Sequence, residues 1–231
     1  MAGDNYYLVS ALPSLPEPGS VPPLSLAALR EHVIHAAAAR TLVDAILLGD
    51  DLLQRDAALA GEIQEVEPAL LTPAQVRDDE PLPPYLAPAE DGGTTRIASD
   101  AVWEAYFRHA AAVARQRGSR FLTAWVGHEV ALRNALAAAR AKTLDLDPAG
   151  YLVAPELGDT DEDVTALLGD WSGAENPLEG IRILDAARWQ WLDGHDAWFS
   201  FGDDELAAYA AKLMLLVRWH RLSKPRAEEP G

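Results

Sequence analysis

The segment from Ser119 to Pro148 constrains the fold of this chain more than any other stretch. Its apolar residues recur three and four positions apart, at Leu122, Trp125, Val126, Leu132, Leu136 and Ala139. This spacing places them along one face of a helix, and the arginines, asparagine and lysine of the segment fall on the less apolar positions. The segment therefore predicts one long helix with an apolar stripe. It carries no phosphate-binding loop and no spacing of metal ligands.

Five further stretches repeat this helical pattern and begin or end at residues that cap helices. Ser25, Asn176 and either Ser99 or Asp100 are suited to accept a backbone N–H at a helix start, and Gly118 is suited to end one helix before Ser119 begins the next. No stretch of useful length alternates apolar and polar residues, as a half-buried strand would. The chain is therefore predicted to be all-α. The expected long helices lie near residues 26–38, 40–60, 100–117, 119–143, 177–192 and 203–223.

Three segments depart from this pattern. Tyr6–Ala11 is a short apolar run that predicts either a strand or a short buried segment. Gly49, Asp50 and Asp51 interrupt the second helix and predict a kink or a break there. Residues 68–93 are rich in proline and acids and predict a long loop with a short helix near Pro73–Asp78. We treat the chain as one helical subunit with possible lobes at 1–67 and 94–231 on either side of this loop.

The composition narrows the classes of partner. The chain has 36 Asp and Glu against 19 Lys and Arg, which gives a formal net charge of −17. Such a charge repels nucleic acid and anionic lipid, so neither is an expected partner. The chain has no cysteine, which excludes disulfides and Cys-based zinc sites. Its start lacks the pattern of a signal peptide, and no apolar run reaches the ~18 residues of a membrane span. We expect a soluble protein inside the cell.

The candidate catalytic and metal motifs are incomplete. His128-Glu129 resembles the start of a zinc-protease helix motif, but that motif needs a second histidine where Leu132 stands. The acids between Asp145 and Glu156 match a calcium loop only in part, because Ala149 occupies a ligand position. The cluster from Asp159 to Asp163 is typical of a solvated helix start. We therefore expect no metal, no cofactor and no enzyme activity.

Two kinds of structural interaction are expected instead. Glu129 and Arg133 lie four residues apart and could pair on one helix face, with Asn134 as a further polar member of the set. Aromatic residues gather in the last third of the chain as a core or as anchors for a partner protein, with Arg188 and Arg218 near enough in sequence to stack on their rings. The tryptophans of this group are Trp189, Trp191, Trp198 and Trp219.

Three parts of the chain together resemble the C (d-type) subunit of V/A-type rotary ATPases. Tyr6–Ala11 resembles its opening, and Glu129–Leu152, EVALRNALAAARAKTLDLDPAGYL, resembles its pattern of an acid, Arg-Asn, Arg-Ala-Lys and a short acidic turn. The end, from Asn176-Pro177 to KLMLLVRWHRL, is most similar to a small uncharacterised bacterial family encoded beside V-type ATPase genes. Residues 68–93 have no counterpart in this resemblance.

The resemblance implies a non-catalytic function. A protein of this kind is an elongated or funnel-like arrangement of antiparallel helices in similar lobes. It forms a socket that couples the central stalk to the membrane rotor ring, and it supports ion transport without an active site. The expected partners are the central-stalk subunits and the rotor ring. The expected location is the cytoplasm, peripheral to the inner membrane through protein partners. The candidate structural or partner-contact residues are Tyr6, Tyr7, Glu129, Arg133, Asn134, Arg140, Lys142, Asp185, Arg188, Trp189, Arg218 and Trp219.

Two other accounts of function remain open at this stage. A helical adaptor or regulatory protein unrelated to ATPases would share the composition and the helix pattern. An enzyme would need a buried cluster of convergent polar groups, for which the sequence gives no motif.

Overall fold

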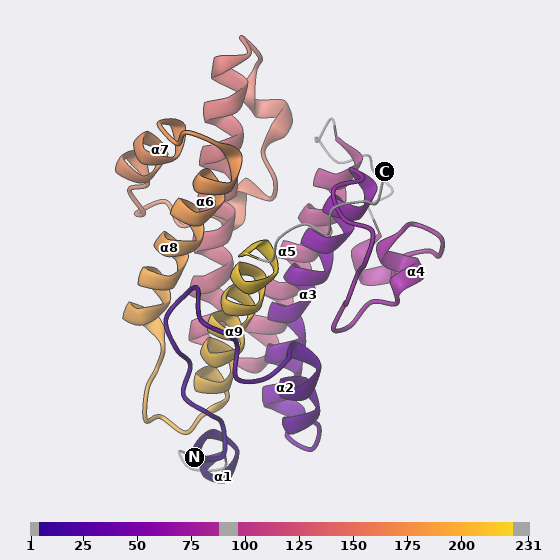
Figure 1. Ribbon diagram of the computed structural model, residues 1–231, viewed down its shortest axis with the longest axis vertical. Coiled ribbons are helices and arrows are strands. Elements are labelled where there is room, and N and C mark those ends of the chain that lie inside the picture. The colour runs from indigo at the N-terminus through magenta and orange to yellow at the C-terminus, as the bar shows by residue number, and fades with distance from the viewer. Residues whose placement is uncertain (1–4, 88–96, 224–231) are drawn as a thin grey trace.

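The computed structural model describes residues 5–87 and 97–223, and every regular element in these two ranges is helical (Figure 1). The all-α prediction is confirmed. The α-helices are α1 Tyr6–Ser10, α2 Leu26–His32, α3 Ala37–Leu59, α4 Pro73–Val76, α5 Ala98–Arg117, α6 Arg120–Thr143, α7 Thr165–Ser172, α8 Pro177–His195 and α9 Asp203–Ser223. Three short 3-10 helices are η1 Pro84–Leu86, η2 Pro148–Tyr151 and η3 Pro155–Leu157.

The predicted helix boundaries hold best where local capping chemistry sets them. The hydroxyl of Ser119 accepts a hydrogen bond from the N–H of Leu122, and the side chain of Asn176 accepts one from Glu179. Gly118 ends α5 with φ +64°, a left-handed conformation that glycine adopts at little cost. These residues fix the tight turn between α5 and α6 and the start of α8.

The first predicted helix ends earlier in the sequence than expected, and the second begins earlier. α2 ends at His32 and α3 already begins at Ala37, so the helix predicted over 26–38 is too long. β-branched Val33 and Ile34 favour a helix less than the leucines and alanines before them, which helps the chain to turn here. Val33 is fully buried, and the turn keeps it in the core beside Leu29.

The break predicted at Gly49–Asp51 is wrong, because α3 runs through these residues as one helix. A Cβ atom at Gly49 would lie 2.9 Å from the hydroxyl of Tyr106, so the glycine permits a close approach of α5. Asp50 forms an ion pair with Arg221 on α9. Gly49 and Asp50, which the sequence pattern predicts to interrupt the helix, therefore make contacts with α5 and α9 instead.

Asp51 ties the start of the proline-rich loop to α3. Its carboxylate accepts hydrogen bonds from the backbone N–H groups of Ala69, Leu70 and Leu71 at 2.7, 2.8 and 2.8 Å. The predicted short helix of this loop is present as α4, and Thr72 caps it. Residues 88–93 of the predicted loop lie outside the described part of the chain.

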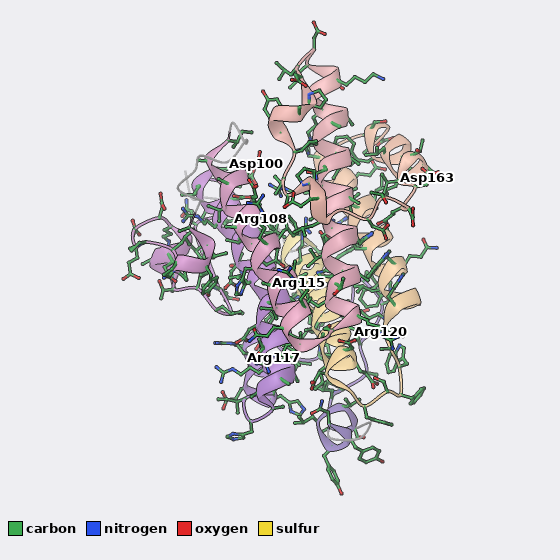
Figure 2. All side chains as sticks on the ribbon, turned by 180° about the vertical axis from the view of Figure 1, so that it is seen from behind. Asp100, Arg108, Arg115, Arg117, Arg120 and Asp163 are labelled. Carbon is green, nitrogen blue, oxygen red and sulfur yellow. The ribbon has the colours of Figure 1, made fainter. Side chains whose placement is uncertain are left out.

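Two other local predictions are corrected. Tyr6–Ala11 is neither a strand nor a buried segment, since α1 is a short helix without a buried residue. Ser99 and Asp100 do not cap α5, which begins at Ala98. Their side chains instead reach neighbouring helices, where the hydroxyl of Ser99 donates to Asp56 and Asp100, labelled in Figure 2, accepts from Arg133.

One continuous hydrophobic core joins the helices, and α9 lies near its centre. α9 contacts α2, α3, α6 and α8, and Figure 1 shows it between α3 and α8. Buried apolar residues extend from Leu26 on α2 to Leu215 on α9, so both predicted lobes contribute to the same core. The division into lobes at 1–67 and 94–231 stays a prediction. Residues 94–96 and 224–231 are outside the described ranges.

None of the described helices combines the length and apolar character that crossing a membrane requires.

Candidate functional site

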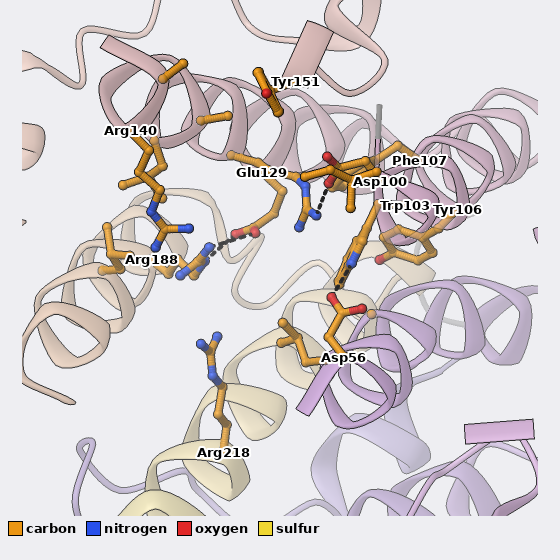
Figure 3. Close-up of a pocket in the computed structure, with 18 of the residues that line it drawn as sticks. Asp56, Asp100, Trp103, Tyr106, Phe107, Glu129, Arg140, Tyr151, Arg188 and Arg218 are labelled. Atoms are coloured by element: carbon orange, nitrogen blue, oxygen red, sulfur yellow. Dashed lines mark hydrogen bonds and ion pairs between the residues drawn. The ribbon is translucent and has the colours of Figure 1, made fainter. Parts of the chain in front are cut away.

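A cleft of about 500 Å³ opens where α5 and α6 separate from their shared turn at Gly118 (Figure 3). Its walls come from α3, α5, α6, α8 and α9, and they are mainly apolar. Charged groups enter from both sides, with four arginines and three carboxylates in the lining. The charged lining residues are Arg133, Arg140, Arg188, Arg218, Asp56, Asp100 and Glu129.

An ion-pair network ties α6, α8 and α9 together at this cleft. Arg188 on α8 donates from Nε and Nη2 to the two oxygens of Glu129 on α6, at 2.6 and 3.1 Å. Asp185 accepts from Nη1 of Arg188 at 3.3 Å and pairs with Nη1 of Arg218 on α9 at 3.1 Å. The fork of Arg188 thus holds two carboxylates at once, a geometry that lysine could not reproduce.

Burial and pairing act against each other on the ionisation of this network. Burial favours the neutral form of Glu129, but the charge and hydrogen bonds of Arg188 prevail and lower its pKa. For Asp185 burial prevails and raises the pKa, although Arg218 and Arg188 oppose it. Burial likewise lowers the pKa of Arg218. Among the described residues, Oδ2 of Asp185 is buried with no hydrogen-bond partner.

The opposite wall holds its charges in a different way. Asp56 on α3 accepts hydrogen bonds from the hydroxyl of Ser99 and, at 2.8 Å, from the indole N–H of Trp103. Arg133 donates to Asp100 at 2.9 Å, and its guanidinium lies 4.5 Å from the centre of the Trp103 ring. Figure 3 shows these groups of α3 and α5 across the cleft from Arg188 and Arg218.

Half of the residues predicted from the sequence gather around this cleft. Glu129, Arg133, Arg140, Arg188 and Arg218 line it, and Asp185 joins the network beside it. Asn134 instead holds the segment after α6, since its side-chain amide exchanges hydrogen bonds with the backbone N–H and C=O of Val153 at 2.8 and 2.9 Å.

The other predicted residues lie apart from the cleft lining. Lys142 is exposed near the end of α6, and the half-buried Trp189 lies within reach of Lys212. The indole nitrogen of Trp219 on α9 packs near Gly19. Tyr6 and Tyr7 are exposed on α1.

The partners predicted for the charged residues are wrong in two respects. Glu129 and Arg133 do not pair with each other along α6, because each reaches a different neighbouring helix. Arg188 and Arg218 bind carboxylates, and the cation over the Trp189 and Trp198 rings is Lys212, at 5.7 Å from each ring centre. Three residues of the cleft were not identified from the sequence, because their contacts form only in three dimensions and no local motif indicates them. These residues are Asp56, Asp100 and Trp103.

The cleft is better suited to recognition than to proton transfer. Arginine stays protonated, and burial raises the pKa of Tyr106 so that its phenol also stays protonated. The carboxylates already accept hydrogen bonds from arginine, serine or tryptophan side chains. No set of three or more His, Asp and Glu side chains in the described ranges is arranged to hold a metal ion. The exposed guanidinium of Arg140 beside an apolar wall is suited to bind an acidic, partly apolar protein segment.

Comparison of the chain with known proteins identifies a family that it matches. No curated protein and no solved structure matches the chain. The profile of the family described as "Protein of unknown function (DUF2764)" matches residues 82–230, a range that includes α5 to α9 and so four of the five helices around the cleft. Because this match spans more than half of the sequence, the chain belongs to the DUF2764 family.

Proposed function

We propose that this protein is a non-catalytic subunit of a V/A-type rotary ATPase, a socket that couples the central stalk to the membrane rotor ring. The resemblance rests on three segments of the sequence, of which the second contains Glu129 and the third contains Arg188 and Arg218. The observation that carries the proposal is that these three residues meet in one buried network at the cleft.

The network has a mechanical consequence that suits such a coupling subunit. A part that transmits torque must not let its helices slide past one another under load. Buried charges resist such sliding, because breaking a buried pair leaves an unpaired charge at a cost of about 3–5 kcal/mol. Glu129, Arg188, Asp185 and Arg218 apply this constraint to α6, α8 and α9 at the cleft wall.

The surface chemistry suits contacts that form and separate repeatedly. Exposed acids of the acidic stretches that begin at residues 44 and 143, such as Glu80 and Asp161, would supply a charged rim. Interactions of such a rim act mainly through steering and weaken with salt. Arg140 adds an exposed cation to the cleft itself, where its guanidinium lies 5.2 Å from the centre of the Trp171 ring. An acidic segment of a stalk subunit would fit beside this arginine.

Affinity purification from the native cells tests the proposal. The tagged chain should recover central-stalk or rotor-ring subunits, identified by mass spectrometry, and recover fewer of them at high salt. It should lie on the cytoplasmic side of the inner membrane when the complex is present. The purified chain alone should hydrolyse no ATP. Recovery of no ATPase subunit from cells that contain the complex would leave the helical adaptor as the better account.

A matched pair of charge reversals locates the contact. Arg140→Glu changes an exposed cation in the cleft lining, whereas Lys142→Glu makes a similar change two residues away, outside that lining. We expect Arg140→Glu to reduce the recovery of the ATPase subunits about tenfold or more and Lys142→Glu to leave it within about twofold, as expected for a central against a peripheral contact. Circular dichroism should show both variants folded. Equal effects of the two variants would exclude the cleft as the contact.

A further inference from the structure

At one end of the molecule, α1 approaches the loop between α8 and α9 (Figure 1), and both segments carry exposed aromatic side chains. Tyr7 is 85% exposed, Phe199 79%, Trp198 57% and Tyr6 51%. We call these four residues the aromatic end surface. Exposed apolar groups gathered at one place mark interaction sites more often than single exposed residues do.

Ring contacts join the two segments that form the aromatic end surface. The rings of Tyr6 and Tyr7 lie 5.6 Å apart between centres, and Tyr6 lies 5.0 Å from the ring of Phe201 in the α8–α9 loop. Trp198 and Phe199 lie 6.0 Å apart in the same loop. The contact of Tyr6 with Phe201 therefore brings α1 and the α8–α9 loop together in one aromatic region.

The loop that presents these rings holds an unfavourable backbone conformation. Ala197, Phe199 and Phe201 have φ of +49°, +61° and +50°, in the left-handed region that favours glycine. The buried carboxylate of Glu205 holds the loop, because it accepts hydrogen bonds from the N–H of Phe199 at 3.1 Å and of Phe201 at 2.6 Å. The ring of Phe199 gains little burial in return, which points to a role outside the chain.

The charges beside the aromatic end surface favour a partner with cationic side chains. Residues 193–205 contain five Asp and Glu and no Lys or Arg. Glu205 is buried and Asp204 accepts hydrogen bonds at the start of α6, whereas Asp193 is exposed and Asp196 and Asp203 are half-buried. Lys212 lies behind them and pairs with Asp193 and Asp196. Such a setting attracts cationic side chains, which aromatic faces also bind, and it repels anionic lipid. A symmetric contact with a second copy would bring two acidic segments together.

We propose that the aromatic end surface is a docking site for a segment of a partner protein that carries aliphatic side chains between lysines or arginines. The aromatic rings would cover the aliphatic side chains, and the carboxylates of Asp193, Asp196 and Asp203 would face the cations. This inference goes beyond the proposed function, since the surface lies apart from the cleft and the argument holds for any assembly.

The probe is a labelled helical peptide with a leucine face flanked by lysines, and its binding is measured by fluorescence anisotropy. Phe199→Gly removes a ring and also suits the left-handed φ, so this variant should keep or raise the melting temperature. It should bind the peptide about tenfold more weakly or worse, as should Trp198→Ser. Leu59→Ser, which changes an exposed leucine at the end of α3, should stay within about twofold of the unmodified protein.

Four outcomes would overturn the proposal. Two concern the peptide: Phe199→Gly binds it as tightly as the unmodified protein does, or a peptide with glutamates in place of the lysines binds equally well. The other two concern a different occupant: phosphatidylglycerol vesicles bind the protein in a way that depends on Phe199, or the protein self-associates in sedimentation in a way that depends on Phe199. The ATPase proposal fails separately. Suppose that Phe199→Gly weakens binding of the model peptide while the unmodified chain recovers no ATPase subunit. The docking proposal is then supported, and only the ATPase proposal is contradicted.

Discussion

Two regions of this protein bury carboxylates by different means. In α3, Asp51 is surrounded by backbone and accepts three N–H groups of residues 69–71. At the cleft, Glu129 and Asp185 are held by arginine side chains from α8 and α9. The first arrangement anchors a nearby loop to one helix. The second joins three helices, so its loss should spread further through the fold.

The largest expected effect comes from Arg188. Arg188→Ala leaves Glu129 without its arginine partner and Asp185 with Arg218 alone, so we expect a loss of about 3–5 kcal/mol in the free energy of unfolding. Urea unfolding measures it. The control Arg140→Ala removes an exposed arginine of the same cleft and should change stability by less than about 0.5 kcal/mol. A loss below about 1 kcal/mol for Arg188→Ala would mean that the network does not secure the helices.

A somewhat smaller effect is expected at Asp51. Asp51→Ala removes the acceptor of three backbone N–H groups, of which only that of Leu71 belongs to a buried residue. Water can replace the carboxylate at the other two, so we expect a loss of about 2–3 kcal/mol. Amide hydrogen exchange should accelerate at residues 69–71 and much less in α6 and α8. Faster exchange throughout α6 would contradict the local role of Asp51.

The smallest effect is in the pH dependence, because Asp51 and Glu129 have pKa values shifted in opposite directions. Burial raises the pKa of Asp51 to about 6, despite its backbone donors, so between about pH 4 and 6 the folded state binds a proton that the unfolded state has released. Its contribution to stability therefore falls as the pH rises through this range. Glu129 has a lowered pKa, so its contribution is present above the ordinary pKa of glutamate and is lost in acid.

Neutral variants separate these two contributions. The stability difference between the unmodified protein and Asp51→Asn should shrink as the pH rises from about 4 to about 6. The difference between the unmodified protein and Glu129→Gln should grow as the pH rises from acid to above about 4.5, with one pKa unit worth about 1.4 kcal/mol. Urea unfolding at a series of pH values measures both. If both stability differences change with pH in the same direction, the pKa values of Asp51 and Glu129 are not shifted in opposite directions.

The sequence by itself determined the fold class and several helix ends. Apolar spacing predicts α6 and α9, and Ser119, Asn176 and Gly118 set boundaries that the structure keeps. These features are local, because a capping residue acts on N–H groups two or three positions away and helical period is a property of one segment.

Only the tertiary structure decided how the charged and small residues are used. Glu129 could pair with Arg133 four residues away, yet it binds Arg188, which lies 59 positions along the chain, while Arg133 turns to Asp100. Gly49 looks like a helix breaker but serves the close approach of Tyr106. The free energy of these choices comes from burial between helices, which depends on which faces meet in space and not on spacing within any one segment.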